Sequence, residues 1–217
     1  MNITVANLMP PQSYRVNRRV EKQKLIRHRR ERSLALGPCM RLQFEDELTI
    51  RYQIQEVLYA ERIDGAEHIR HEIDTNAHLV PDGSNWKATL LIELPDAGER
   101  QRDLPRLNEA AHRIYVDVPR HGRVFAQANE DQADRHLTRP SAVHFLRFQF
   151  TDPLRAALLD GAATMLGCAH DQYAFRRVIP PATLARLRRD LIVPPLHTKA
   201  RTETSPPCAN KIRLNWK

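Results

Sequence analysis

The sequence contains few of the residues on which short catalytic motifs depend. Its 217 residues include only seven glycines, and these form no glycine-rich loop that could cradle phosphates. The G-x-S-x-G turn of a serine nucleophile and the HExxH zinc motif are also absent. Nucleophilic catalysis and phosphate-loop chemistry therefore have no motif in this chain.

Cysteine and long apolar runs are scarce too. Cys39, Cys168 and Cys208 show no CxxC spacing, and an odd, scattered set fits a reducing compartment better than a disulfide framework. No apolar run reaches the length of about 18 residues that a membrane span needs. The start, "MNITVANLMPPQSYRV", lacks the basic and apolar segments of a secretory signal. Together these absences predict a cytoplasmic protein.

Positive charge is abundant but concentrated at the two ends of the chain. The net charge is +8 at pH 7. Residues 12–36 hold nine Arg or Lys against two Glu, and residues 196–217 hold five against one. The segment between these ends is therefore acidic overall, which argues against a central domain that reads nucleic acid.

Residues 12–36 form the first predicted element, a long and largely solvated helix. Pro10 and Pro11 precede the segment, and Gly37 with Pro38 ends it. Its apolar residues make only a ragged stripe, which is typical of a charged outer helix. Alternatively, the helix contacts DNA, RNA or an acidic partner, and its phosphate contacts would be nonspecific and sensitive to salt. The candidate nucleic-acid residues are Arg15, Arg18, Arg19 and Lys22.

The rest of the chain mixes strands and helices. The segments "CMRLQF", "ATLLIELP" and "SAVHFLRFQF" are predicted strands, and "RIYVDVPRHGRVFAQAN" alternates on both sides of "PRHG" as a β-hairpin does. A helix is predicted in "TIRYQIQEVLYAERI" with Thr49 as its N-cap, and another after Asp64. Strands outnumber strand–helix–strand units, so we predict an α+β fold with a mixed or antiparallel sheet and flanking helices. Its parts are a basic N-terminal helical arm (1–36), an α+β core domain (37–195) and a disordered, Pro-rich basic tail (196–217).

Glu61 is the first candidate for a metal site. At about 100° per residue it falls inside the apolar stripe of its helix, and Glu72 lies at the edge of the stripe of the next helix. A carboxylate in such a place is costly unless it is paired, protonated or bound to a cation. If these two carboxylates converge with His144, the ligand set suits iron, manganese or zinc. The alternative is a buried ion pair of Glu61 with Arg147 or Arg62, with His144 as a hydrogen-bonded core residue.

Strand alternation separates the two polar residues in the middle of "SAVHFLRFQF". His144 and Arg147 are an odd number of residues apart, so they point to opposite faces of one strand. The two are not expected to serve one site unless a bulge intervenes. Glu56, Glu93 and Arg147 complete the candidate polar residues of the core.

Three blocks of the sequence resemble the matching blocks of a bacterial protein family of unknown function. These are "YQIQEVLYAERI", "LVPDGSNWKATLLIELPD" and "SAVHFLRFQF". The resemblance spans residues 12–192, and residues 196–217 extend beyond it. Members of that family are often encoded beside rubrerythrin and an iron–sulfur oxidoreductase of the heterodisulfide-reductase type. The resemblance therefore implies a cytoplasmic protein linked to peroxide handling or electron transfer, and it supplies no catalytic residues.

The sequence thus supports hypotheses from different classes. The first is a redox- or oxidative-stress-associated accessory protein that binds a metal and partners an iron–sulfur oxidoreductase or rubrerythrin. The second is a noncatalytic nucleic-acid-associated module that uses the basic N-terminal arm. A third is an enzyme of unknown reaction with a pocket lined by Glu61, His144 and Arg147.

Overall fold

The computed structural model describes residues 3–128 and 140–192, which contain two antiparallel sheets. The larger sheet has the strand order β1-β2-β3-β7-β6, and the smaller sheet has the order β5-β4-β8-β9. The strands of the larger sheet are β1 Ser33–Leu36, β2 Met40–Phe44, β3 Asn85–Ile92, β6 Gln127–Ala128 and β7 Val143–Gln149. Those of the smaller sheet are β4 Ile114–Val118, β5 Gly122–Phe125, β8 Met165–Cys168 and β9 Arg176–Val178.

The two sheets share one hydrophobic core. Buried and half-buried residues alternate along β2, because successive side chains of a strand point to opposite faces. Phe44, Trp86 and Phe148 are fully buried in this core, and the rings of Phe44 and Trp86 meet edge to face at 5.9 Å. Trp86 Nε1 donates a hydrogen bond to the carbonyl oxygen of Leu187 at 2.9 Å, which fixes the last helix against the larger sheet.

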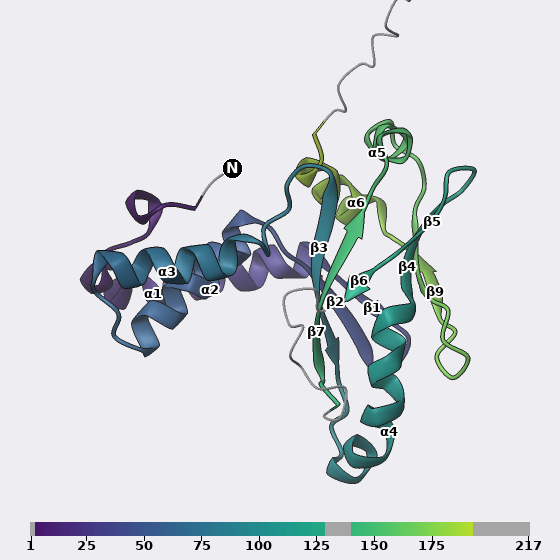
Figure 1. The fold of residues 1–217 in the computed structure, drawn as a ribbon, viewed down its shortest axis with the longest axis horizontal. Helices are drawn as coiled ribbons and strands as arrows, with labels where there is room; N and C mark the ends of the chain where they lie inside the picture. Colours follow the sequence, from purple (N-terminus) through teal and green to yellow (C-terminus); the bar gives the residue numbers. More distant parts are fainter. Residues whose placement is uncertain (1–2, 129–139, 193–217) are drawn as a thin grey trace, which may run out of the picture.

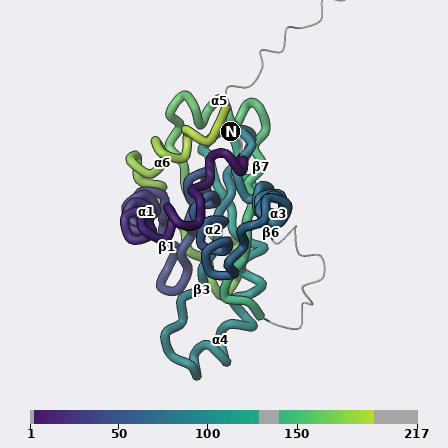
Figure 2. The backbone as a smooth tube through the Cα atoms, turned by 90° about the vertical axis from the view of Figure 1, so that its left-hand side faces the viewer, coloured from purple at the N-terminus to yellow at the C-terminus, as the bar shows by residue number. Residues whose placement is uncertain are grey.

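Three helices project from the larger sheet, on the left in Figure 1, and we call them the helical extension. They are α1 Pro11–Glu31, α2 Glu47–Ala60 and α3 Ala66–Ala77, with the short 3-10 turn η1 Val5–Asn7 against α3. Figure 2 shows α1 and α3 on either side of α2. A second apolar cluster joins α2, α3 and the N-terminal segment, and it is built from Ile3, Ile50, Ile54, Leu58, Ile73 and Leu79.

The remaining helices pack around the core of the two sheets. They are α4 Ala97–Ala110, α5 Asp152–Leu159 and α6 Pro181–Leu187, with 3-10 turns η2 Ala111–Arg113 after α4 and η3 Arg188–Asp190 after α6. Leu107, Leu158 and Leu184 bury one side of each helix in that core. Figure 1 places α4 at the lower right and α5 at the top of the molecule.

The prediction of a helix that continues to Leu36 is wrong for its last residues. α1 ends at Glu31, and Ser33–Leu36 form β1, which pairs with β2 in a hairpin around Gly37. Leu34 and Leu36 are buried while their neighbours are half-buried, which is a strand pattern. Gly37 has φ +66°, a left-handed conformation that suits glycine in a tight turn. Burial of the two leucines in the sheet outweighs the helix propensity of this segment.

The predicted start of α2 is also shifted. Asp46, and not Thr49, is the N-cap, since its Oδ1 accepts a hydrogen bond from Thr49 N at 3.0 Å. Asp46 N donates in return to Thr49 Oγ1 at 2.9 Å. This reciprocal capping box satisfies two backbone donors at the first turn, so α2 begins at Glu47.

The predicted α+β class with antiparallel sheets and flanking helices is confirmed. The β-hairpin around "PRHG" is confirmed as well, and its two strands are β4 and β5. Within the described ranges, no helix combines the length and the apolar character that crossing a membrane requires. The tail predicted at 196–217 lies outside the residues that the structure describes.

Candidate functional site

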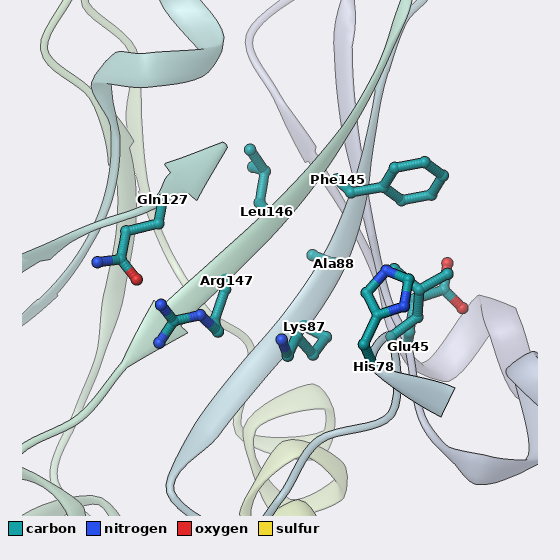
Figure 3. A pocket seen from close by; sticks show the side chains of 9 residues that line it. Glu45, His78, Lys87, Ala88, Gln127, Phe145, Leu146 and Arg147 are labelled. Carbon is teal, nitrogen blue, oxygen red and sulfur yellow. The ribbon is translucent and has the colours of Figure 1, made fainter. Parts of the chain in front are cut away.

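The larger sheet carries a hollow on its outer face, where the helical extension meets it. The hollow is open to solvent, and the space of about 350 Å³ at this place includes that open solvent. Its wall comes from the end of β2, from β3, β6 and β7, and from the chain just after α3. The side chains that matter for its chemistry are Glu45, His78, Lys87, Gln127, Phe145 and Arg147, which Figure 3 shows as sticks.

Glu45 supplies the acidic group of the hollow. It follows Phe44, whose ring is buried in the core, so the side chain of Glu45 turns to the opposite face of the sheet. Only 3% of the residue is exposed. Its Oε1 accepts from Thr89 Oγ1 at 2.6 Å, while Oε2 is buried and receives no hydrogen bond from the described residues. A buried oxygen without a donor costs about 1–3 kcal/mol, so such atoms are rare in folded proteins.

Cationic side chains occupy other parts of the same wall. Lys87 neighbours Glu45 across the sheet, because Glu45 N donates to the carbonyl oxygen of Lys87 at 2.9 Å. Figure 3 shows Lys87 between Glu45 and His78 on one side and Arg147 on the other. Arg147 Nη1 donates to Gln149 Oε1 at 2.6 Å, which holds the guanidinium along β7. The hollow thus combines a carboxyl group with two cationic side chains and an imidazole.

The three predicted metal ligands do not form a common site. α2 ends at Ala60, so Glu61 leaves the apolar stripe and is exposed, while Glu72 is half-buried in α3. His144 is buried in β7. Among residues 3–128 and 140–192, no three His, Cys, Asp or Glu side chains form a group that could hold a metal ion. These residues therefore do not fit an iron, manganese or zinc site.

The alternative ion pair of Glu61 is not formed either. The structure records no salt bridge between Glu61 and Arg62 or Arg147, all of which lie in its described part. Arg62 has φ +56°, so the chain turns sharply just after α2. This turn places Glu61 at the surface, where a carboxylate needs no buried partner.

His144 and Arg147 lie on opposite faces of β7, as the alternation indicates. His144 is 1% exposed, and its Nε2 lies 2.8 Å from the carbonyl oxygen of Ser141. His144 is therefore a hydrogen-bonded residue of the core. Glu93, another candidate polar residue, is exposed and accepts from Arg41 Nε at 2.9 Å. Only Arg147 of this set reaches the hollow.

Glu56 is the centre of a second polar group, between α1 and α2. Arg18 Nη2 donates to Glu56 Oε2 at 2.6 Å, and Arg18 Nε donates to Oε1 at 2.9 Å. Tyr14 Oη donates to the same Oε1 at 2.5 Å. The Arg18 guanidinium also lies over the ring of Tyr59, 4.9 Å from its centre. Arg18, a candidate nucleic-acid residue in the sequence, and Glu56, a candidate polar residue of the core, are therefore each other's partners.

The pKa values of this group show what it can do chemically. The hydrogen bonds from Arg18 hold the pKa of Glu56 at about 2, with help from Tyr14 and Tyr52 and against the effect of partial burial. Burial raises the pKa of Tyr14, and the neighbouring Glu56 raises it further. Burial also raises the pKa of Tyr52. The carboxylate stays ionised and the phenols stay neutral near pH 7, so the group joins two helices and does not exchange protons.

The outer face of α1 carries two neighbouring stripes. Arg15, Arg19 and Lys22 follow one another at helical spacing, are exposed, and form no salt bridge with any described residue. Val16 and Val20 lie beside them and are 81% and 50% exposed. This outer face of α1 is therefore both cationic and apolar, whereas Arg18 of the predicted nucleic-acid set turns inward to Glu56.

The sequence patterns did not predict Glu45, Lys87 or Tyr14 as polar groups of a site. Alternation in "MRLQFE" places Phe44 inward and Glu45 outward, which is the signal that could have found Glu45. The same alternation in "NWKATLLI" sets Lys87 opposite Trp86. No local pattern shows that the end of α3 covers this part of the sheet.

Comparison with known proteins identifies the family. Residues 2–191 match the model of a family described as "Protein of unknown function (DUF3501)". The chain belongs to this family. A crystal structure at 1.90 Å resolution, of a "novel protein of unknown function" from Burkholderia pseudomallei K96243, is 40% identical to this DUF3501 chain. That match covers 88% of this chain and 100% of the Burkholderia chain, with a TM-score of 0.84. A comparison with curated proteins finds no match.

Proposed function

We propose that this DUF3501 protein is an accessory factor of a redox or oxidative-stress system. It binds an iron–sulfur oxidoreductase or rubrerythrin through the outer face of α1. The class of partner rests on the resemblance of the three sequence blocks, and the docking surface rests on the structure. The observation that carries the proposal is the stripe of Arg15, Arg19 and Lys22 beside the exposed Val16 and Val20.

The composition of this surface favours a protein with an acidic and partly apolar face. Arg15, Arg19 and Lys22 form no salt bridge in the described structure, so their charges can complement an acidic surface of a partner. Such complementarity steers the encounter of two proteins and fixes how they are aligned in the complex. Two exposed valines one helical turn apart form a small apolar centre that a protein partner would cover. The internal pair of Arg18 and Glu56 holds α1 in place, so the surface is presented without a folding cost.

The same features make nucleic acid the second choice. Phosphate contacts need cations but gain nothing from exposed valines. The one aromatic residue of α1 is Tyr14, which is 1% exposed, so this helix offers no ring for stacking on bases. Salt-dependent binding to duplex DNA or to RNA is therefore an outcome that would replace the proposal.

Binding to the rubrerythrin and the iron–sulfur oxidoreductase of the same organism tests the proposal. The variant Arg15→Glu/Arg19→Glu/Lys22→Glu is expected to weaken binding at least about tenfold. A matched control replaces three exposed arginines outside α1 with glutamate, at Arg113, Arg176 and Arg189. This control is expected to bind with unchanged affinity. The variant Val16→Ser/Val20→Ser weakens binding without a change in its salt dependence.

Three results would reject the proposal. The first is an absence of binding to either protein, and the second is equal loss of affinity in the variant and its control. The third is binding to DNA or RNA that the α1 variant abolishes. Elemental analysis of anaerobically purified protein is run in parallel, since bound iron, manganese or zinc would restore the metal hypothesis with ligands other than the three predicted ones.

A further inference from the structure

We propose that the helical extension binds a carboxylate with a short apolar body, such as a fatty acid of medium chain length. The site lies at the end of the extension away from the larger sheet, on the left in Figure 1. The apolar body fills a cavity between the N-terminal segment, α1, α2 and α3, and the carboxylate lies beside Arg62 and Arg15. Only Arg15 is shared with the outer face of α1, so this proposal goes beyond the proposed function and does not depend on it.

The cavity is covered by the N-terminal segment, residues 3–10. Figure 2 shows this segment in dark purple between α1 and α3, and η1 contacts α3. Gln55 of α2 holds the cover in place, because its Oε1 accepts from Met9 N at 2.6 Å and its Nε2 donates to Met9 O at 3.2 Å. The apolar side chains of the wall include those of Val5, Leu8, Met9, Pro11, Leu58 and Ile69.

The buried polar side chains of the wall already have partners. Gln55 is bound to the backbone of Met9, and Tyr14 Oη donates to Glu56 Oε1 at 2.5 Å. An ordered water needs two to four polar partners, so this wall favours an apolar guest over water. The cavity measures about 160 Å³ and is partly open to solvent. Apolar cavities of about this size bind benzene, so a body of about six carbon atoms or slightly more fits here.

Two cationic side chains lie next to the cavity. Pro11, Leu58 and Tyr59 line both the cavity and a neighbouring surface depression, which also includes Arg15 and Arg62. Both arginines are exposed and form no salt bridge with any residue that the structure describes. A ligand that fills the cavity and extends into the depression therefore meets positive charge, and this favours an anionic head group.

Arg62 is suited to hold the carboxylate. Its φ of +56° is a left-handed conformation that residues other than glycine rarely adopt, and such strained positions cluster at ligand sites. A guanidinium binds a carboxylate through two parallel hydrogen bonds, which fixes the orientation of the head group. Asp64 lines the same depression, but it is exposed, so water and salt screen its repulsion of the ligand.

Calorimetric and thermal-shift titrations of the full-length protein test this site. The probes are hexanoate and octanoate, with hexanol and octanol as ligands without the charge and acetate as a ligand without the chain. At about ten times its dissociation constant, the tighter carboxylate is expected to raise Tm by about 3 °C or more. Each alcohol binds more weakly than its carboxylate, and acetate gives no shift.

Three results of these titrations would overturn the proposal. The first is an absence of binding of both carboxylates, and the second is equal binding of an alcohol and its carboxylate. The third is binding to vesicles of phosphatidylglycerol and phosphatidylcholine without any response to the free carboxylates, since the apolar surface would then belong to a membrane contact.

Two variants assign the ligand to the cavity and to its mouth. Val5→Phe fills the cavity from its cover and is expected to weaken octanoate binding at least about tenfold, whereas Val178→Phe, at an exposed valine of β9, leaves it unchanged. Arg62→Gln lowers the affinity for octanoate to that for octanol and leaves octanol binding unchanged, and its control is Arg176→Gln. Unchanged octanoate affinity in a folded Val5→Phe or Arg62→Gln protein would reject the site, and Arg62→Gln decides if Val5→Phe does not fold.

Discussion

Arg18 and Glu56 are joined by two hydrogen bonds, Nη2 to Oε2 at 2.6 Å and Nε to Oε1 at 2.9 Å, which tie α1 to α2. A two-pronged contact of this kind fixes the orientation of the guanidinium as well as its distance. Tyr14 Oη donates a further hydrogen bond to Oε1 of the Glu56 carboxylate, at 2.5 Å. The consequence is that the basic helix is anchored by one of its own arginines.

Replacing Glu56 should lower stability in a pH-dependent way. Glu56→Gln leaves Arg18 and Tyr14 without their ionised partner and should cost about 1–3 kcal/mol of unfolding free energy at pH 7. The folded pKa of Glu56 lies at about 2, below its ordinary value of 4.5, so its contribution is present above pH 4.5 and disappears toward pH 2. Urea denaturation of both proteins between pH 2 and 7 measures the difference.

The control for this prediction is Glu61→Gln. Glu61 is exposed beyond the end of α2, so its replacement should change stability by less than about 0.5 kcal/mol, with or without a chelator. Equal losses in the two variants would show that the pairing of Glu56 contributes nothing specific. A chelator effect that Glu61→Gln removes would instead support the metal hypothesis.

Asp190 should give the protein a pH dependence of the opposite sign. Burial raises the pKa of Asp190 to about 6, with Asp46 adding to the effect and Arg32 and His28 opposing it. The folded state therefore holds this proton more tightly than the unfolded state, so stability falls as the pH rises from about 4 to 6. The contribution amounts to about 3 kcal/mol.

The variant Asp190→Asn isolates the contribution that titration of Asp190 makes to stability. It cannot titrate, so the difference in unfolding free energy between wild type and variant should change steadily between pH 4 and 6 and be constant below that range. Asp190 accepts a hydrogen bond from Arg32 Nη2, which stays buried in the variant, so the comparison is made across pH and not at one pH. A difference that does not vary with pH would show that Asp190 has an ordinary pKa.

His144 should act through its hydrogen bond and not through a metal. His144→Leu keeps a similar volume but leaves the carbonyl oxygen of Ser141 without the contact at 2.8 Å. We expect a loss of about 1–3 kcal/mol in thermal unfolding and no change in the metal content of the purified protein. Metal that is present in the wild type and absent from the variant would contradict this assignment.

Two glycines with positive φ separate backbone strain from a steric clash. A Cβ at Gly37 (φ +66°) would lie 2.6 Å from Tyr173 Oη, whereas a Cβ at Gly122 (φ +94°) meets nothing within 4 Å. Both alanine variants carry the strain, of about 1 kcal/mol or more. Gly37→Ala should be the less stable in chemical denaturation, because Tyr173 Oη also donates to the carbonyl oxygen of Leu36 at 2.6 Å. A Cβ at Gly37 would also lie 2.7 Å from the ring of Phe175, so equal losses would mean that the Tyr173 and Phe175 rings both move aside freely.

Local patterns in the sequence were enough to predict the fold class and the hairpin around "PRHG". They also placed His144 and Arg147 on opposite faces of β7, since that follows from alternation alone. The end of α1 was mispredicted because the burial of Leu34 and Leu36 depends on β2. Helix periodicity placed Glu61 in an apolar stripe, but it cannot show that the helix has ended one residue earlier.

The polar contacts were harder to predict because they join segments far apart in the chain. Arg18 and Glu56 are separated by 38 residues, and their contact depends on how α1 packs on α2. The hollow at Glu45 needs the larger sheet and the chain after α3 together. Charge patterns identify which residues require partners, but tertiary packing decides which partners they obtain.

Two of the three connections between the larger sheet and the helical extension are very short. A single residue, Arg32, lies between α1 and β1, and two residues lie between β2 and α2. Arg32 also joins these two connections by hydrogen bonds. Its Nε donates to the carbonyl oxygen of Phe44 and its Nη2 donates to that of Glu45, each at 3.1 Å. The helical extension is thus attached to two adjacent strands, β1 and β2, and a displacement of α1 would be expected to reach Phe44 and Glu45 through Arg32.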